Sequence, residues 1–211
     1  SGNYSEEPIV IDNDTARTRL SVIADATVIH NRDIHNRVDD SVVRVVGGTP
    51  RLLRRSRGYA PSPIALDIDV EGILAAGAEL KNCFALGKGR YALLSQHIGD
   101  LKTAETYDFY LETVERMKRL FRFEPTLIAC DTHPDYLSTR YANQSGLPTT
   151  AVQHHHAHIA SCMAEHRLTE KVIGIALDGT GYGDDGTTWG GVFLVCDLIG
   201  YERCAHFTPV M

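Results

Sequence analysis

Apolar and polar positions along the chain alternate in a way that predicts short strands and helices. Apolar residues recur at 3.6-residue spacing from Ala104 to Phe121, which predicts an amphipathic helix. Short apolar runs typical of buried strands follow at Thr126–Cys130, Pro148–Gln153 and Val172–Leu177. A further helix is expected to end near Asn143. Since strands and helices alternate, the pattern predicts an α/β fold with a largely parallel sheet.

Upstream of these elements the pattern is weaker. It predicts a helix from Ala16 to Ala26 and a strand from Ser41 to Val46, with a turn at Gly47–Pro50. Two apolar stretches, Ile73–Leu86 and Tyr91–Leu94, predict a hairpin. The segment Gly87-Lys88-Gly89 should form the break between them.

The segment Tyr59-Ala60-Pro61-Ser62-Pro63 interrupts regular structure, and we place a domain boundary there. The expected domains are residues 1–62 and residues 63–211. Length and composition are compatible with this division. A chain of 211 residues with 43% hydrophobic content can form one large domain or parts of two.

The net charge of −6 disfavours a general nucleic-acid binder. No apolar run approaches the length of a membrane span and no signal peptide is visible. The chain starts at Ser1 and ends after an apparent strand, so a fragment is expected. Five cysteines without a CxxC pair are expected to be reduced core residues of a cytoplasmic protein. They are Cys83, Cys130, Cys162, Cys196 and Cys204.

Four histidines gather at His154, His155, His156 and His158. If this segment is helical, His154 and His158 lie one turn apart on one face, which is the spacing by which a helix gives two imidazoles to a metal. The residue after the first histidine is not the glutamate of metalloproteases, which argues against a peptidase. Asp178, after the next strand, could supply an oxygen ligand. Such a set suits iron(II) or zinc, although polar capping of a helix would also explain the histidines.

The two middle histidines have different expected roles. On a helix His155 and His156 point about 100° and 200° away from His154, so the whole run cannot bind one ion. His155 could replace one of the ligands, or it could form a hydrogen bond that orients a ligand without binding the ion itself. Replacing His156 is expected to be the mildest change of the run.

Glycines follow Asp178 directly. A turn at Gly179-Thr180-Gly181 would free backbone N–H groups to approach a phosphate, and an ordinary hairpin turn is the alternative.

A second candidate site lies in the arginine segment. Guanidinium groups suit phosphate and carboxylate oxygens, and a solvated basic strand edge is the alternative. The segment contains Arg51, Arg54, Arg55 and Arg57, with Arg44 upstream.

Long motifs resemble one family. SGNYSEEPI, DDSVVR and RRSRGYAPSPI resemble the end of the YrdC-like domain of the HypF family, the carbamoyltransferases of nickel–iron hydrogenase maturation. CDTHPDYLSTRYA, VQHHHAHIASCMAEH and ALDGTGYGDDGTTWGGVFL resemble the start of the domain that follows, as do LKNCFALGKG and LSQHIGDL. That domain is similar to the proteins that form threonylcarbamoyladenosine in tRNA and to the actin-like ATPases. The resemblance therefore implies the end of a YrdC-like α/β domain followed by the first part of an actin-like, ribonuclease H-like α/β domain.

The resemblance also implies a reaction. Carbamoyl phosphate and ATP, the latter with Mg, give carbamoyl-adenylate in the first domain. The second domain carries a divalent metal and transfers the carbamoyl group to the C-terminal cysteine of the partner HypE, where it is later dehydrated to a cyanide ligand of iron. No membrane or nucleic-acid partner is expected.

The family's functional positions map onto this chain. Ser1 and Asn3 match the nucleotide loop, Ser41 matches a strand-motif serine, and the arginine segment near phosphate contains Arg54 and Arg57. The catalytic metal ligands match His154, His158 and Asp178, and the phosphate-facing turn matches Gly179, Thr180 and Gly181. The family's acylphosphatase-like domain and zinc-finger-like segment are not in this sequence. Most of the YrdC-like domain, with its lysine and arginine motif, is also missing, as is the C-terminal half of the last domain, which carries a further aspartate ligand.

Other functions share parts of this pattern. An O-carbamoyltransferase of secondary metabolism or a tRNA-modifying relative would have the same HxxxH and Asp set. A noncatalytic metal- or nucleotide-binding module of the actin-like superfamily is a further alternative. The RRSRGYAPSPI and DDSVVR motifs favour the hydrogenase-maturation type.

Overall fold

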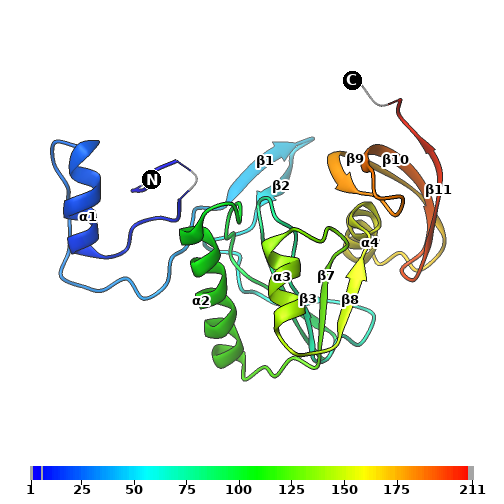
Figure 1. Cartoon of the computed structure of the whole chain (residues 1–211), viewed down its shortest axis with the longest axis horizontal. Coiled ribbons are helices and arrows are strands. Elements are labelled where there is room, and N and C mark those ends of the chain that lie inside the picture. The colour runs from blue at the N-terminus through cyan, green and yellow to red at the C-terminus, as the bar shows by residue number, and fades with distance from the viewer. Residues whose placement is uncertain (1, 6, 209–211) are drawn as a thin grey trace. The chain divides into compact units, whose positions relative to one another are not determined.

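A computed structural model describes residues 2–5 and 7–208 as mixed α/β structure (Figure 1). Ser1, expected in the nucleotide loop, lies outside the described residues. Contacts divide the chain into two compact units that interleave along the sequence. The first contains Ser1–Pro63, Glu79–Phe84 and Leu93–Phe123, and the second contains Ile64–Ala78, Ala85–Ala92 and Glu124–Met211. The domain boundary near Pro61 stays a prediction. No helix in the described part of the chain is long and apolar enough to cross a membrane.

Helices of the first unit begin at side-chain caps. α1 spans Asn13–Arg19, because the Asp12 carboxylate accepts the Thr15 N–H, and a 3₁₀ turn follows at Leu20–Val22. The expected helix from Ala16 to Ala26 was therefore placed several residues too late. α2 spans Ala104–Phe121 as its apolar spacing predicts, with Thr103 as its N-cap.

The strands of the first unit form one antiparallel hairpin, β1 (Val42–Val46) and β2 (Thr49–Arg54). The turn consists of Gly47 and Gly48, both at positive φ, which glycine tolerates best. The predicted turn was too long, because Thr49 and Pro50 already pair with β1. The arginine segment thus begins on an exposed strand.

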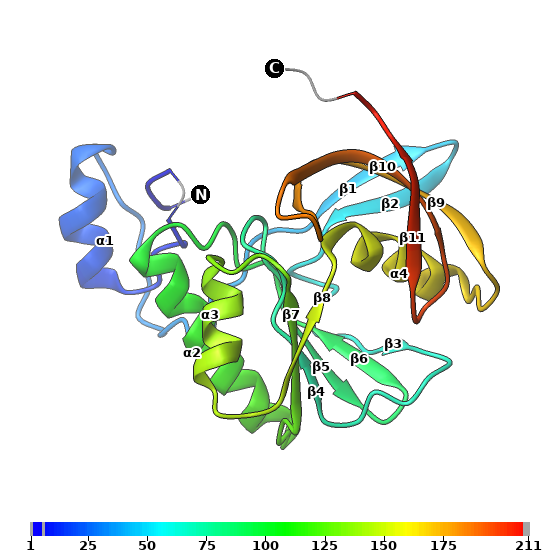
Figure 2. The same cartoon turned by 45° about the vertical axis from the view of Figure 1, so that its right-hand side comes forward.

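A mixed six-stranded sheet, assigned mainly to the second unit, has the order β3-β6-β5-β4-β7-β8 (Figure 2). β4 pairs with β7, and β7 with β8, in parallel, whereas β3–β6 and β4–β5 are antiparallel. The expectation of a largely parallel sheet was wrong, because the first strands form a meander. The order β6-β5-β4-β7-β8 agrees with the expected ribonuclease H-like fold. The strands are β3 (Ile64–Ala65), β4 (Ile73–Ala75), β5 (Ala85–Lys88), β6 (Tyr91–Leu94), β7 (Leu127–Asp131) and β8 (Thr149–Val152).

Gly87 and Lys88 belong to β5 and not to the predicted hairpin break. A Cβ at Gly87 would lie 2.0 Å from the Val70 carbonyl oxygen, so close backbone approach requires glycine here. Only the last residue of the predicted break was correct, because the chain turns at Gly89, which has positive φ.

The carboxyl-terminal part of the second unit is a three-stranded antiparallel sheet, β11-β10-β9, covered on one face by α4 (Figure 2). Its core joins Ile159 and Met163 of α4 to Trp189, Val192 and Leu194 of β10. The remaining elements are α3 (Leu137–Gln144), α4 (His154–His166), β9 (Val172–Tyr182), β10 (Thr188–Cys196) and β11 (Tyr201–His206).

β9 is longer than its apolar run, because it continues through Gly179-Thr180-Gly181 to Tyr182. The predicted turn at residues 179–181 was therefore wrong. The alternative of a hairpin turn in this glycine-rich segment was correct, because the chain turns between Gly183 and Thr187. Leu177 pairs with Gly191 and Gly181 with Trp189, so residues 178–180 oppose Gly190 alone. This bulge changes which side chains face α4.

All five cysteines are free. Cys130 and Cys196 are buried, whereas Cys162 and Cys204 are exposed. The expectation that the cysteines are core residues was wrong for these two, because both lie on outward-facing positions of regular elements.

Candidate metal centre

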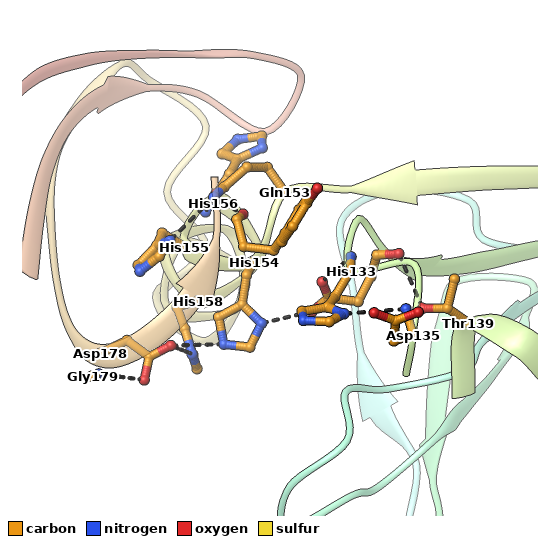
Figure 3. Close-up of polar contacts among 12 residues, drawn as sticks. His133, Asp135, Thr139, Gln153, His154, His155, His156, His158, Asp178 and Gly179 are labelled. Atoms are coloured by element: carbon orange, nitrogen blue, oxygen red, sulfur yellow. Dashed lines mark hydrogen bonds and ion pairs between the residues drawn. The ribbon is translucent and has the colours of Figure 1, made fainter. Parts of the chain in front are cut away.

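The histidine run forms the first turns of α4, as its spacing predicts. The Gln153 side chain caps the helix by accepting the His156 N–H. His154 and His158 lie on one face with ring centroids 4.9 Å apart (Figure 3). One helix therefore presents two imidazoles to the same point.

Asp178 reaches that point from β9. The buried positions Gly174 and Ala176 face α4, and Asp178 continues this alternation up to the bulge. Its Oδ2 lies 2.9 Å from Nε2 of His154 and 4.0 Å from Nε2 of His158 (Figure 3). The Oδ1 atom accepts the Gly179 N–H, which fixes the direction of the carboxylate.

Asp131 is the residue that the sequence did not reveal. It ends β7, and its Oδ2 lies 2.6 Å from Nδ1 of His154. Its other oxygen accepts the His133 N–H at 2.9 Å. The buried carboxylate thus holds a proton on Nδ1 of His154 and leaves Nε2 facing Asp178. The sequence signal that could have identified Asp131 is a carboxylate at the C-terminal end of a buried parallel strand, where binding sites form in α/β sheets.

The pKa values of the two ligand imidazoles, His154 and His158, are shifted in opposite directions. The hydrogen bond to Asp131 raises the pKa of His154, and Asp178 adds to this. Desolvation lowers the pKa of His158, and the neighbouring His154 lowers it further. The carboxylates therefore raise the pKa of His154, whereas burial and the neighbouring imidazole lower that of His158.

His155 and His156 point away from the centre, as expected from the helix geometry. His155 is fully buried, its Nδ1 lies 3.1 Å from the amide nitrogen of Gln153, and burial lowers its pKa. Nε2 of His156 lies 2.7 Å from the Asp197 carbonyl oxygen and its ring lies beside Tyr201. That His156→Ala is the mildest change for metal binding stays a prediction.

A divalent metal fits these residues. The Asp178 Oδ2 atom is buried and has no hydrogen bond of normal geometry in the described chain, although it faces two imidazoles. The donor atoms of His154, His158 and Asp178 lie within 4.8 Å of one another. Donors that bind one ion at about 2.0–2.2 Å lie about 3–4 Å from one another, so only small shifts of these side chains are required. Two imidazoles with one carboxylate are a common catalytic donor set.

The other predicted site residues lie in the first unit or in β9. Asn3 and Arg54 line one cavity of about 410 Å³, together with Arg37 and His97. Ser41 and Arg57 are not among its lining residues. The Ser41 hydroxyl instead donates to the Arg57 carbonyl and accepts the Ser56 N–H. Gly179, Thr180 and Gly181 lie in β9 and not in a turn, and their contact with phosphate stays a prediction.

Three protein-family models match the chain. "HypF Kae1-like domain" matches residues 69–165, and "Carbamoyltransferase, Kae1-like Domain, second subdomain" matches residues 174–211. A third model, described as "Telomere recombination" and covering the Sua5, YciO and YrdC proteins, matches residues 1–56.

Curated relatives carry the same family name. Carbamoyltransferase HypF of Synechocystis sp. is 50% identical over 211 residues, which is 99% of this chain and 28% of the relative. The Rhizobium leguminosarum bv. viciae protein is 45% identical over 210 residues, which is 100% of this chain and 28% of the relative. The chain thus spans little more than a quarter of the length of these relatives.

Solved structures agree with the sequence relatives. A full-length HypF in a phosphate- and nucleotide-bound form is 56% identical, with a TM-score of 0.93 over 96% of this chain and 32% of that one. HypF of T. kodakarensis is 44% identical, with a TM-score of 0.90 over 98% of this chain and 28% of that one.

Proposed function

Because the chain belongs to the HypF family of carbamoyltransferases, we propose that its parent protein transfers a carbamoyl group during nickel–iron hydrogenase maturation. The substrates are carbamoyl phosphate, ATP with bound Mg, and one water molecule, and they yield carbamoyl-adenylate, phosphate and pyrophosphate. The acceptor is the C-terminal cysteine of HypE. The cluster of His154, His158 and Asp178 carries the proposal, because it is a catalytic donor set inside the Kae1-like match.

In the transfer step the acceptor sulfur attacks the carbamoyl carbon. The bond from that carbon to the adenylate oxygen breaks, AMP leaves, and the thiol proton is released. A divalent iron or zinc ion bound by His154, His158 and Asp178 would supply positive charge for an oxygen of the mixed anhydride. Asp131 orients His154 for this role by accepting its Nδ1–H.

Adenylate formation belongs to the YrdC-like residues in this proposal. Arg54 contributes to a cavity that also contains Asn3, and its guanidinium group would bind phosphate oxygens. Arg57 and Ser41 keep the same expected role near the nucleotide. The proposed division of labour makes the two half-reactions separable by mutation.

The test uses two assays on the full-length protein. ATP–pyrophosphate exchange dependent on carbamoyl phosphate measures adenylate formation, and labelled carbamoyl on HypE measures transfer. Arg54→Ala and Arg57→Ala are expected to weaken exchange. Asp178→Ala is expected to retain exchange and to stop transfer. Arg119→Ala, which removes an exposed arginine from the last turn of α2, outside both candidate sites, is the matched control and should affect neither assay.

Loss of both signals in Asp178→Ala, with the fold intact by circular dichroism, would contradict the separation of the two steps. The metal assignment has its own test by elemental analysis. If the double variant His154→Ala/His158→Ala retains a full complement of metal, the ligand assignment is wrong.

A further inference from the structure

The amide of Gln153 lies between the histidine helix and the strand that carries Asp178. This side chain is 3% exposed, and it belongs to the residue directly before α4. Figure 3 shows it beside His155 and His156 at the start of the helix. It is therefore adjacent to the metal-binding residues without contacting the proposed ion.

Each polar atom of the Gln153 amide has a defined partner. Oε1 accepts the His156 N–H at 2.9 Å. Nε2 lies 3.2 Å from the Tyr182 carbonyl oxygen and 3.1 Å from Nδ1 of His155, so its two hydrogens serve both. A reversed amide would place an oxygen against the Tyr182 carbonyl, so the contacts fix its orientation.

Close packing reinforces these hydrogen bonds. His155 and Ile159, one turn apart on α4, lie against Gly181 and Gly174 of β9. A Cβ at Gly181 would be 2.2 Å from Cε1 of His155, and one at Gly174 would be 2.6 Å from Cγ1 of Ile159. The helix therefore approaches the strand at two glycines, and Gln153 adds a hydrogen bond to the strand beside the Gly181 contact.

We propose that Gln153 is a positioning residue, which ties the first turn of α4 to the end of β9 and so sets the distances from His154 and His158 to Asp178. The inference rests on the proposed metal site. Its physical basis is that two ligands come from the helix and one from the strand. A change in the position of the helix relative to the strand alters both histidine–carboxylate distances at once.

Two substitutions separate this role from simple helix capping. Gln153→Met keeps the approximate length of the side chain and removes all its hydrogen bonds. Gln153→Glu keeps the oxygen that caps His156 but cannot donate to Tyr182 or His155. Its added negative charge would by itself favour a bound cation, so weaker binding in this variant must come from the lost tie. Gln96→Met is the matched control, because Gln96 is also buried and donates to the Arg37 carbonyl in the other unit.

The first measurement is hydrogen–deuterium exchange on the metal-free, full-length variants. In Gln153→Met, exchange should become faster in residues 153–160 and 176–183, with α2 unchanged. In Gln153→Glu, the strand segment should become faster while the helix segment remains closer to the wild type. Wild-type exchange in residues 176–183 in both variants would overturn the proposal.

The second measurement is the dissociation constant of cobalt(II), followed by its visible absorption. Both Gln153 variants should bind about 10–100-fold more weakly, the usual effect of removing a group that orients a metal ligand. Gln96→Met should bind like the wild type. Wild-type affinity and an unchanged cobalt spectrum in Gln153→Glu would overturn the positioning role. If His154→Ala does not change cobalt binding, the metal assignment fails, and the exchange experiment alone then decides whether the tie exists.

Discussion

Replacing Gly181 by alanine tests how tightly α4 packs on β9. The new Cβ would lie 2.2 Å from Cε1 of His155 and 2.8 Å from both ring nitrogens. Favourable carbon–carbon contacts lie at about 3.5–4.0 Å, so the atoms must separate by at least about 1.3 Å. The His155 ring is fully buried and contacts Gln153, so it cannot simply rotate into solvent. Overpacking of this kind costs about 1–3 kcal/mol.

The matched control is Gly179→Ala. This glycine lies on the same strand, and a Cβ there meets nothing within 4 Å among the described residues. Since glycine is costly in a strand interior, Gly179→Ala should be neutral or slightly stabilising, by less than about 1 kcal/mol.

Alkylation of Cys196 in the full-length protein provides the assay. This thiol is 1% exposed and belongs to the core that α4 and the three-stranded sheet share. Its alkylation requires opening of that core, so a loss of about 1–3 kcal/mol should accelerate the reaction by about 5–150-fold. Equal rates for Gly181→Ala and Gly179→Ala would refute the packing argument. Weaker nucleotide binding in both variants, with Cys196 still protected, would instead favour a phosphate-binding role for these glycines.

Three other side chains provide separate tests of the described contacts. Asp131→Asn should weaken metal binding about 10–100-fold, measured as the cobalt(II) dissociation constant. The reason is that a neutral amide would bind the Nδ1–H of His154 less strongly than the carboxylate does. Unchanged cobalt affinity would contradict this role of Asp131. Hydrogen bonds from Thr187 lower the pKa of Asp185 to about 2. The stabilisation that Asp185→Ala removes should therefore be present above about pH 4 and disappear as the pH falls towards 2, as measured by hydrogen–deuterium exchange in the turn at residues 183–187. A difference in exchange between variant and wild type that grew with acidification would contradict this prediction. At about pH 8, alkylation with peptide mapping should modify exposed Cys162 quickly and Cys83 slowly, because burial raises the pKa of Cys83 to about 11; equal rates would contradict the assignment.

Elements whose apolar residues recur at regular helical spacing were predictable from the sequence. α2 begins and ends where its spacing indicates, because its apolar face is continuous and Thr103 caps it. The i,i+4 relation of His154 and His158 also followed directly from helix geometry. In both cases the information lies within a few neighbouring residues.

Other features depend on contacts between distant segments. Glycines at 179 and 181 indicated a turn, yet Gly181 is needed because His155 packs against the strand at that point. Asp131 acts on a histidine 23 residues away, and no local pattern encodes that pairing. The bulge after Leu177 was likewise invisible, because it is defined by the partner strand β10.

The short chain distance between α4 and β9 has a consequence for biosynthesis. All three proposed ligands lie between residues 154 and 178, and the helix packs directly on the strand that follows it. Contacts this local need little loop closure and can form early. At about 5–20 residues per second, the ribosome completes this segment within about 1–5 s. We therefore expect the three-ligand set to assemble on the nascent chain once β9 and β10 have emerged, so that metal capture can begin during translation.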